Sequence, residues 1–91
     1  MVEQVEPLTD NKIFSTIHPN PIDAEAEYFF LQVSSLPLNF NLFDLTGKNI
    51  LQIKIFNFQD RIKLNGLQRG IYLYQLNDNL NKKKYGKIVV K

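Results

Sequence analysis

The sequence contains no cysteine and no tryptophan, and it has a single histidine among its 91 residues. The absence of cysteine excludes a disulfide framework and a metal site built on thiolates. It also leaves no thiol nucleophile, and His18 has no second imidazole to work with. A chain of this length buries only about 60–65% of the surface that it exposes when unfolded. These absences leave little scaffold for an active-site cleft and argue against an enzyme.

Long apolar runs are also missing, since no stretch reaches the ~20 residues of a membrane helix. Residues 2–6 are acidic where a secretory signal peptide would be apolar, so any export signal is expected elsewhere in a longer parent. The net charge of +2 does not indicate nucleic-acid binding. The charge is unevenly placed: residues before Asn39 include one lysine and six acidic residues, and the remainder includes ten basic and three acidic residues.

What the chain does contain is a series of short β-strand patterns. Apolar residues make up 44% of the sequence, with seven Phe and four Tyr, which is enough for a compact fold. About seven strand patterns recur at a spacing of roughly 8–14 residues with turn residues between them. We therefore predict an all-β fold, an immunoglobulin-like two-sheet β-sandwich, with a small open barrel as the competing architecture. Residues 1–12 are predicted to be a linker, and residues 13–91 the folded domain.

The individual segments differ in the burial that they imply. Leu38–Leu42 and Leu51–Ile55 alternate apolar and polar residues, as half-buried strands do, around a turn at Asp44–Lys48. Ile71–Leu76 is nearly all apolar, which predicts a central strand buried on both faces. The remaining expectations are a β-segment at Ile13–Ile17, a strand at Tyr28–Val33, a turn at Asn57–Asp60, a loop at Asn65–Arg69 with Leu67 turned inward, and a last strand at Lys83–Val90.

Two sets of side chains invite a binding function. Asp23, Glu25 and Glu27 have the spacing that would place three carboxylates on one face of a strand, where oxygen ligands could hold calcium, although a solvated acidic loop explains them more simply. Exposed aromatic rings would support a carbohydrate-binding or adhesive module, but core packing accounts for most of them. The candidate rings are Tyr28, Phe30, Tyr72 and Tyr74. No phosphate-binding loop or zinc ligand set is present, so we expect no cofactor.

A basic cluster occupies the last predicted strand. Alternation places Lys83, Tyr85, Lys87, Val89 and Lys91 on one face. Lysines on an edge strand discourage pairing with other chains. The same lysines could contact an anionic partner, either a protein or a lipid headgroup. The possible recognition edge comprises Lys82, Lys83, Lys84, Tyr85 and Val89.

Three motifs follow one another along the chain: Ile17–Pro21, Phe43–Lys48, and Leu67–Tyr74 leading to Gly86–Lys91. Each motif alone is weak. In this order and spacing they resemble the type A C-terminal sorting domain of the type IX secretion system of Bacteroidetes, over residues 13–91. Carried over residue by residue, the resemblance marks Pro19, Asn20, Pro21, Asp44, Gly47, Lys48, Gly70, Tyr72, Lys87 and Lys91 as sorting-motif residues.

The resemblance implies a non-catalytic signal fused to the C-terminus of a secreted cargo. Such a cargo enters the periplasm through a Sec signal and is directed across the outer membrane. The implied partners are an outer-membrane translocon, a shuttle and a sortase-like peptidase that removes the signal in many members and joins the cargo to an anionic lipopolysaccharide. The implied location is the cell surface or the medium.

Overall fold

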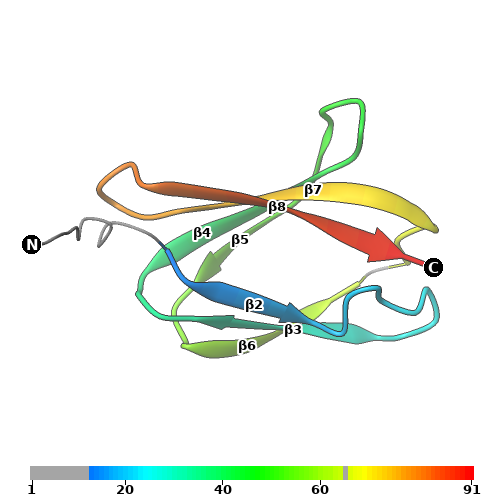
Figure 1. Ribbon diagram of the computed structural model, residues 1–91, viewed down its shortest axis with the longest axis horizontal. Coiled ribbons are helices and arrows are strands. Elements are labelled where there is room, and N and C mark those ends of the chain that lie inside the picture. The colour runs from blue at the N-terminus through cyan, green and yellow to red at the C-terminus, as the bar shows by residue number, and fades with distance from the viewer. Residues whose placement is uncertain (1–12, 65) are drawn as a thin grey trace, which may run out of the picture.

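The computed structural model describes residues 13–64 and 66–91, which form two antiparallel sheets packed face to face (Figure 1). One sheet has the strand order β2-β3-β6, and the other has the order β5-β4-β7-β8. The strands are β2 (Ser15–His18), β3 (Tyr28–Val33), β4 (Leu38–Phe43), β5 (Asn49–Ile55), β6 (Gln59–Lys63), β7 (Gly70–Asn77) and β8 (Lys83–Val90). The prediction of an all-β, immunoglobulin-like sandwich of about seven strands is confirmed, and the described residues contain seven.

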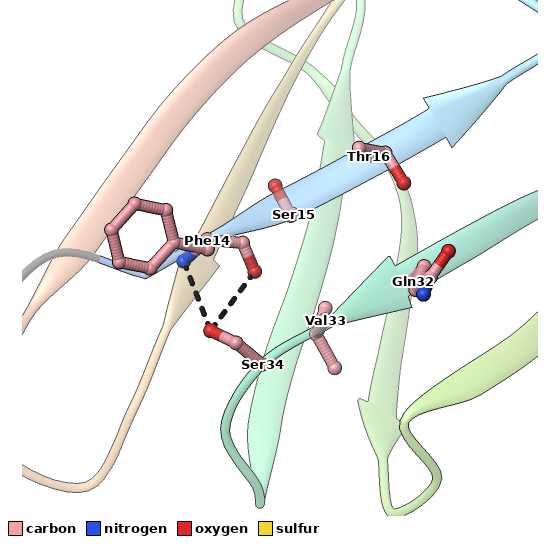
Figure 2. Close-up of a pocket in the computed structure, with 6 residues that line it drawn as sticks. All are labelled: Phe14, Ser15, Thr16, Gln32, Val33 and Ser34. Atoms are coloured by element: carbon pink, nitrogen blue, oxygen red, sulfur yellow. Dashed lines mark hydrogen bonds between the residues drawn. The ribbon is translucent and has the colours of Figure 1, made fainter.

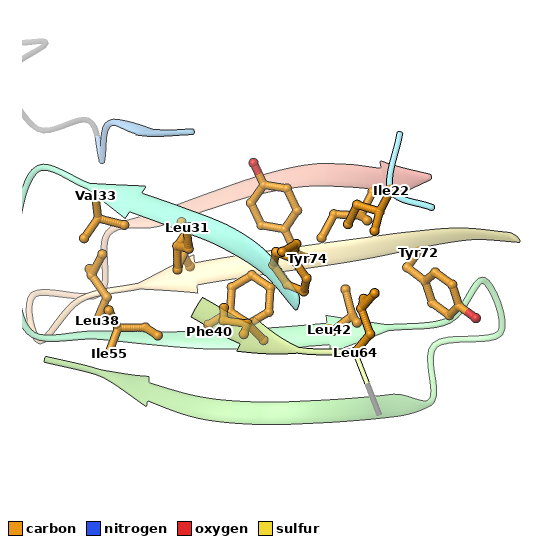
Figure 3. Packing of buried hydrophobic residues seen from close by; sticks show 14 of the residues in the cluster. Ile22, Leu31, Val33, Leu38, Phe40, Leu42, Ile55, Leu64, Tyr72 and Tyr74 are labelled. Atoms are coloured by element: carbon orange, nitrogen blue, oxygen red, sulfur yellow. The ribbon is translucent and has the colours of Figure 1, made fainter. Parts of the chain in front are cut away.

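Alternating sequence patterns become buried and exposed faces as expected. In β4, Leu38, Phe40 and Leu42 are all buried, because residues two apart point to the same side of a sheet. Phe29 of β3 and Phe40 join the two layers, with 6.0 Å between their ring centroids. Within its own sheet, Phe40 lies 5.8 Å from Tyr74 of β7 (Figure 3). Full burial of such a side chain contributes about 1.5–3 kcal/mol.

The prediction for β7 is wrong in one respect. Ile71 and Leu73 are 42% and 45% exposed, whereas Tyr72, Tyr74 and Leu76 are buried. The strand is central in its sheet, but only one side of that sheet is covered by the other layer. An antiparallel sandwich leaves each outer face in solvent, so an apolar run does not require two buried faces here.

The bounds of other elements also differ from those predicted. The turn expected at Asn57–Asp60 is shorter, because Gln59 and Asp60 already pair with β3. The first described strand begins at Ser15, two residues later than Ile13, which is buried in the core instead. Leu67 is half-buried against the core, in the orientation expected for it. The linker predicted at residues 1–12 lies outside the described residues.

Candidate functional site

The motif segments are brought together at one end of the sandwich, at the right of Figure 1. Gly70 pairs with Val90, so the start of β7 lies beside the end of β8. Phe43 pairs with Leu73, which places the β4–β5 hairpin at the same end. The β2–β3 connection reaches this end as well. We call it the motif end; it comprises residues 19–27, 44–48, 70–72 and 87–91.

Asn20 of the Pro-Asn-Pro motif holds the last strand. Its side-chain Nδ2 donates to the carbonyl of Lys87 at 3.0 Å, and its Oδ1 accepts from the backbone N–H of Val89 at 3.1 Å. The peptide bonds before Pro19 and Pro21 are both cis. One amide side chain therefore supplies both a donor and an acceptor to the outer edge of β8, as a neighbouring strand would.

The residues after Asn20 continue this cover along β8. The N–H of Ile22 donates to the carbonyl of Val89 at 2.7 Å, and the N–H of Lys91 donates to the carbonyl of Ile22 at 2.8 Å. Ala24 N–H then donates to the carbonyl of Lys91 at 2.7 Å. Ile22 itself is fully buried in the core. We refer to residues 20–24 as the clasp, because they satisfy the edge of β8 from Lys87 to Lys91.

The clasp corrects the expectation of a freely accessible last strand. Strand β8 is the edge of its sheet. Its C-terminal half is nevertheless covered, and Val89 is half-buried. Sequence reasoning missed this arrangement because 67 residues separate Asn20 from Lys87. The Pro-Asn-Pro residues by themselves indicated only that the preceding strand ends there. Nothing in the neighbouring sequence identified the partner of Asn20.

The Asp44–Lys48 turn is organised by the carboxylate of Asp44. Its Oδ1 accepts from the N–H of Thr46 at 2.9 Å, from the hydroxyl of Thr46 at 2.6 Å and from the N–H of Lys48 at 3.0 Å. The hydrogen bond from the Thr46 hydroxyl lowers the pKa of Asp44 below its ordinary value, assisted by the backbone N–H groups and by the charge of Lys48. Gly47 has φ +91°, a backbone conformation that favours glycine.

The β7–β8 turn repeats this construction. Oδ1 of Asp78 accepts from the N–H groups of Leu80 and Lys82, both at 2.9 Å. Asn81 takes the place of Gly47 and has φ +65°, which asparagine tolerates better than most residues. An aspartate at the first position and a lysine at the fifth therefore mark both hairpins. The sequence predicted the turn at Asp44–Lys48, but it did not reveal that a second hairpin shares its geometry.

Tyr72 and Gly70 fix the start of β7. The hydroxyl of Tyr72 donates to the carbonyl of Gln68 at 2.6 Å, while its ring is buried. A buried tyrosine near the start of this strand that bonds back to the preceding loop is a common feature of immunoglobulin-like sandwiches. Gly70 has φ +154°, which side chains rarely adopt. The Gly-x-Tyr motif thus shapes the crossing between the two sheets.

Gly86 is a motif residue whose role the sequence did not reveal. It pairs with Tyr74 across β7 and β8, and a Cβ atom at this position would clash with the phenol ring. Figure 3 shows that ring among the core residues. The Tyr74 side chain also packs against Phe40. The absence of a side chain at Gly86 is therefore required for the ring to cross toward β8.

The lysines of β8 and of the turn before it divide into two groups by their exposure to solvent. Lys83, Tyr85 and Lys87 are exposed on the outer face, with Tyr85 at 68%. Lys82 and Lys84 are half-buried, and the Nζ of Lys84 donates to the carbonyl of Ser15 on β2 at 3.3 Å. The proposed recognition residues are thus all near one strand, but only its N-terminal half lies outside the clasp. The loop lysines Lys48 and Lys91 are also exposed.

The aromatic candidates for carbohydrate binding do not form one surface. Tyr72 and Tyr74 are buried. On the outer face of β3, the ring of Phe30 stacks on His18 at 5.3 Å, and the guanidinium of Arg61 lies 4.8 Å from the centre of the Tyr28 ring. Neighbouring side chains therefore cover one face of each ring. A sugar could therefore stack on at most one face of Tyr28 or of Phe30, and the buried Tyr72 and Tyr74 offer it none.

The other candidate sites are weak. Among residues 13–64 and 66–91, no three His, Cys, Asp or Glu side chains gather closely enough to hold a metal ion. The carboxylates of Asp23, Glu25 and Glu27 belong to exposed residues, and that of Asp23 accepts from the N–H of Glu25. A shallow hollow beside β2 and β3 is bridged by Ser34, which bonds to both backbone groups of Phe14 (Figure 2). No helix among the described residues is long and apolar enough to cross a membrane.

Comparison with known proteins identifies the family. The model for the secretion system C-terminal sorting domain matches residues 16–91. The chain belongs to this family. The match contains all of the motif end, and it makes the domain a C-terminal sorting signal of the type IX secretion system. No curated protein matches the sorting domain.

A solved structure supports the fold. The sorting domain aligns with the structure of PorZ, described as an essential bacterial surface component of the type IX secretion system of Porphyromonas gingivalis. The TM-score is 0.73 at 18% identity, over 85% of this chain. The chain spans 11% of the PorZ chain. At this level of identity the likeness supports the sandwich architecture.

Proposed function

We propose that the domain is a non-catalytic signal that directs a covalently fused cargo from the periplasm across the outer membrane. In this proposal a shuttle and the outer-membrane translocon recognise the folded domain. A sortase-like peptidase then removes it within or near residues 1–12, and the cargo is attached to the surface or released. The membership of residues 16–91 in the sorting-domain family carries the proposal.

The geometry supports two roles within the signal, one for residues that maintain the fold and one for residues that contact a partner. The motif residues of the clasp, of the Asp44 turn and of the Gly-x-Tyr element are engaged in hydrogen bonds or backbone geometry. We propose that these residues act by maintaining the fold. The exposed side of β8, with Lys83, Tyr85 and Lys87, is then the surface that the machinery contacts. Charged, exposed side chains suit reversible recognition, because they steer association without stabilising the domain.

A reporter fusion tests this proposal. A reporter protein with a Sec signal, followed by residues 1–91, is expected to leave a type IX-competent cell, and deletion of residues 83–91 should stop export. Because that deletion removes all of β8 and is expected to unfold the sandwich, a second variant is needed. The double substitution Lys83→Glu with Lys87→Glu should keep the melting temperature and reduce export. The matched control, Lys54→Glu with Lys63→Glu, changes the same charge at exposed residues elsewhere.

Three outcomes contradict the proposal. Export that survives deletion of residues 83–91 would exclude the domain as the signal. Equal loss of export in the β8 variant and in its control would show that net charge, rather than the surface of β8, is recognised. Retention of export in both variants would remove the exposed side of β8 from the recognition surface.

A further inference from the structure

Large apolar side chains are exposed at the end of the sandwich opposite the motif end. The side chains of Phe14, Phe56, Phe58 and Leu80 are 62%, 65%, 58% and 71% exposed. Only two other large apolar side chains among the described residues are more than half exposed, Leu45 and Tyr85. We call this the apolar end; it is at the left of Figure 1.

Strand pairing places these four side chains at one end. The N–H of Val33 donates to the carbonyl of Phe58 at 2.8 Å, and the N–H of Ser34 donates to that of Phe14 at 3.1 Å, so both phenylalanines lie beside the end of β3. Leu38 pairs with Ile55, which brings the following Phe56 to the start of β4. Asn39 pairs with Asn77, which brings the turn with Leu80 to the same place.

The fold does not use these side chains. They are absent from the hydrophobic core cluster and from the partly buried residues packed against it. A single exposed apolar residue needs no explanation, but several at one end mark an interaction surface. They come from three separate segments, namely the stretch before β2, the β5–β6 connection and the β7–β8 turn, so no single loop sequence accounts for the grouping.

Positive charge accompanies the apolar side chains. Lys83 and Lys84 line a hollow together with Phe14, and Lys82 follows the turn of Leu80. Lys54 is exposed one residue before the end of β5. The carboxylates nearest to this end, in the described part of the chain, are those of Asp60 and Asp78, and each accepts hydrogen bonds from backbone N–H groups.

The motif end is less positive. Asp23, Glu25, Glu27 and Asp44 lie there, and they outnumber Lys48, Lys87 and Lys91 at the same end. The apolar end is therefore the more positive of the two in the described structure. This polarity would orient the domain toward an anionic surface, because a negative potential attracts the lysines and repels the acidic end.

We propose that the apolar end inserts into the headgroup region of an anionic phospholipid bilayer. The apolar side chains stand on three different segments of the chain, with polar residues such as Asn57 and Asn79 beside them. A protein partner would need a matching pocket for each one, whereas a fluid bilayer adapts to separate points. Apolar insertion together with basic residues is the pairing of signals that gives stable but reversible membrane attachment.

Vesicle sedimentation of the full chain tests the proposal. The chain is expected to sediment with vesicles of phosphatidylethanolamine and phosphatidylglycerol in equal parts, and much less with vesicles of phosphatidylcholine alone. The double substitution Phe56→Ser with Phe58→Ser should lower the partition coefficient by at least about tenfold, since burial of each ring is worth that factor or more. Leu45→Ser is the matched control, because Leu45 is 65% exposed at the motif end.

A separate variant tests the contribution of the lysines to binding. Lys82→Gln with Lys83→Gln should reduce the preference for phosphatidylglycerol and the sensitivity to salt, and it should leave weak binding through the phenylalanines. Melting temperatures check that every variant is folded. Failure of the parent chain to bind anionic vesicles would overturn the proposal, and so would equal loss with Leu45→Ser. Binding without vesicles, seen as self-association that Phe56→Ser with Phe58→Ser abolishes, would instead identify a protein-docking surface. None of these readouts depends on secretion, so they stand apart from the export assay.

Discussion

At the motif end, side chains of the family motifs bond to the backbone of other segments. The apolar end has similar bonds from Ser34 and Asp78, but it also presents large apolar side chains to solvent. Asn20 and Tyr72 each satisfy backbone groups across a connection. Phe56 and Leu80 are mostly exposed. The difference indicates that the family motifs mark the end that stabilises the sandwich. Residues that carry a recognisable motif need not be the ones that touch a partner.

The largest effect should come from Gly86, which belongs to the terminal motif. Gly86→Ala is expected to destabilise the domain by about 2 kcal/mol, because the new methyl group overlaps the ring of Tyr74 in a packed core. Urea denaturation measures the change. A second substitution, Tyr74→Val, should make Gly86→Ala nearly neutral by removing the clash, although it lowers stability on its own. Additive effects of the two substitutions would contradict this account.

Substitution of Asn20 tests the difference between the two ends most directly. Asn20→Ala should cost about 1–2 kcal/mol, since it removes two hydrogen bonds and leaves the carbonyl of Lys87 and the N–H of Val89 without these partners. The amide of Val89 should exchange its hydrogen faster. Leu80→Ser at the apolar end is the control and should leave stability unchanged. If both substitutions have the same effect, the contrast between the ends is wrong.

Tyr72→Phe tests the same contrast between the two ends, with a smaller expected loss of stability. The ring remains to fill the core, and only the hydrogen bond to the carbonyl of Gln68 is lost. We expect a loss of about 1 kcal/mol, measured by thermal or urea unfolding. Export of a reporter fusion should persist wherever the variant is folded, because Tyr72 is buried. A folded variant that is no longer exported would show that the hydroxyl is recognised directly.

The smallest effect on stability is expected from lowering the pH. The pKa of Asp44 is lower in the folded chain than its ordinary value of 3.8. Its stabilising contribution is therefore complete above that ordinary value and is lost as the pH falls through the lowered folded pKa. Asp44→Asn should flatten the acid side of the stability curve. NMR titration of the Asp44 carboxyl provides the direct check, and an ordinary or raised pKa would contradict the prediction.

The alternating patterns made much of the fold predictable. Lys83–Val90 is a strand with the predicted bounds, and the turn at Asp44–Lys48 is where it was expected. The error in Ile71–Leu76 arose because an apolar run does not say whether a second layer covers its outer face. The candidate rings Tyr72 and Tyr74 were ambiguous for a related reason, since the same residue type serves a core and a binding surface.

The sequence by itself determined the strand pattern, the turn chemistry and the family, because these depend on residues close together in the chain or on the order of short motifs. Only the tertiary structure decided which residues meet. The clasp joins Asn20 to Lys87, 67 residues away, and four exposed apolar side chains come together from three separate segments. Such contacts depend on how strands pair across the sheets, and no local preference encodes that pairing. Only the three-dimensional arrangement therefore revealed which end of the domain maintains the fold and which is exposed for binding.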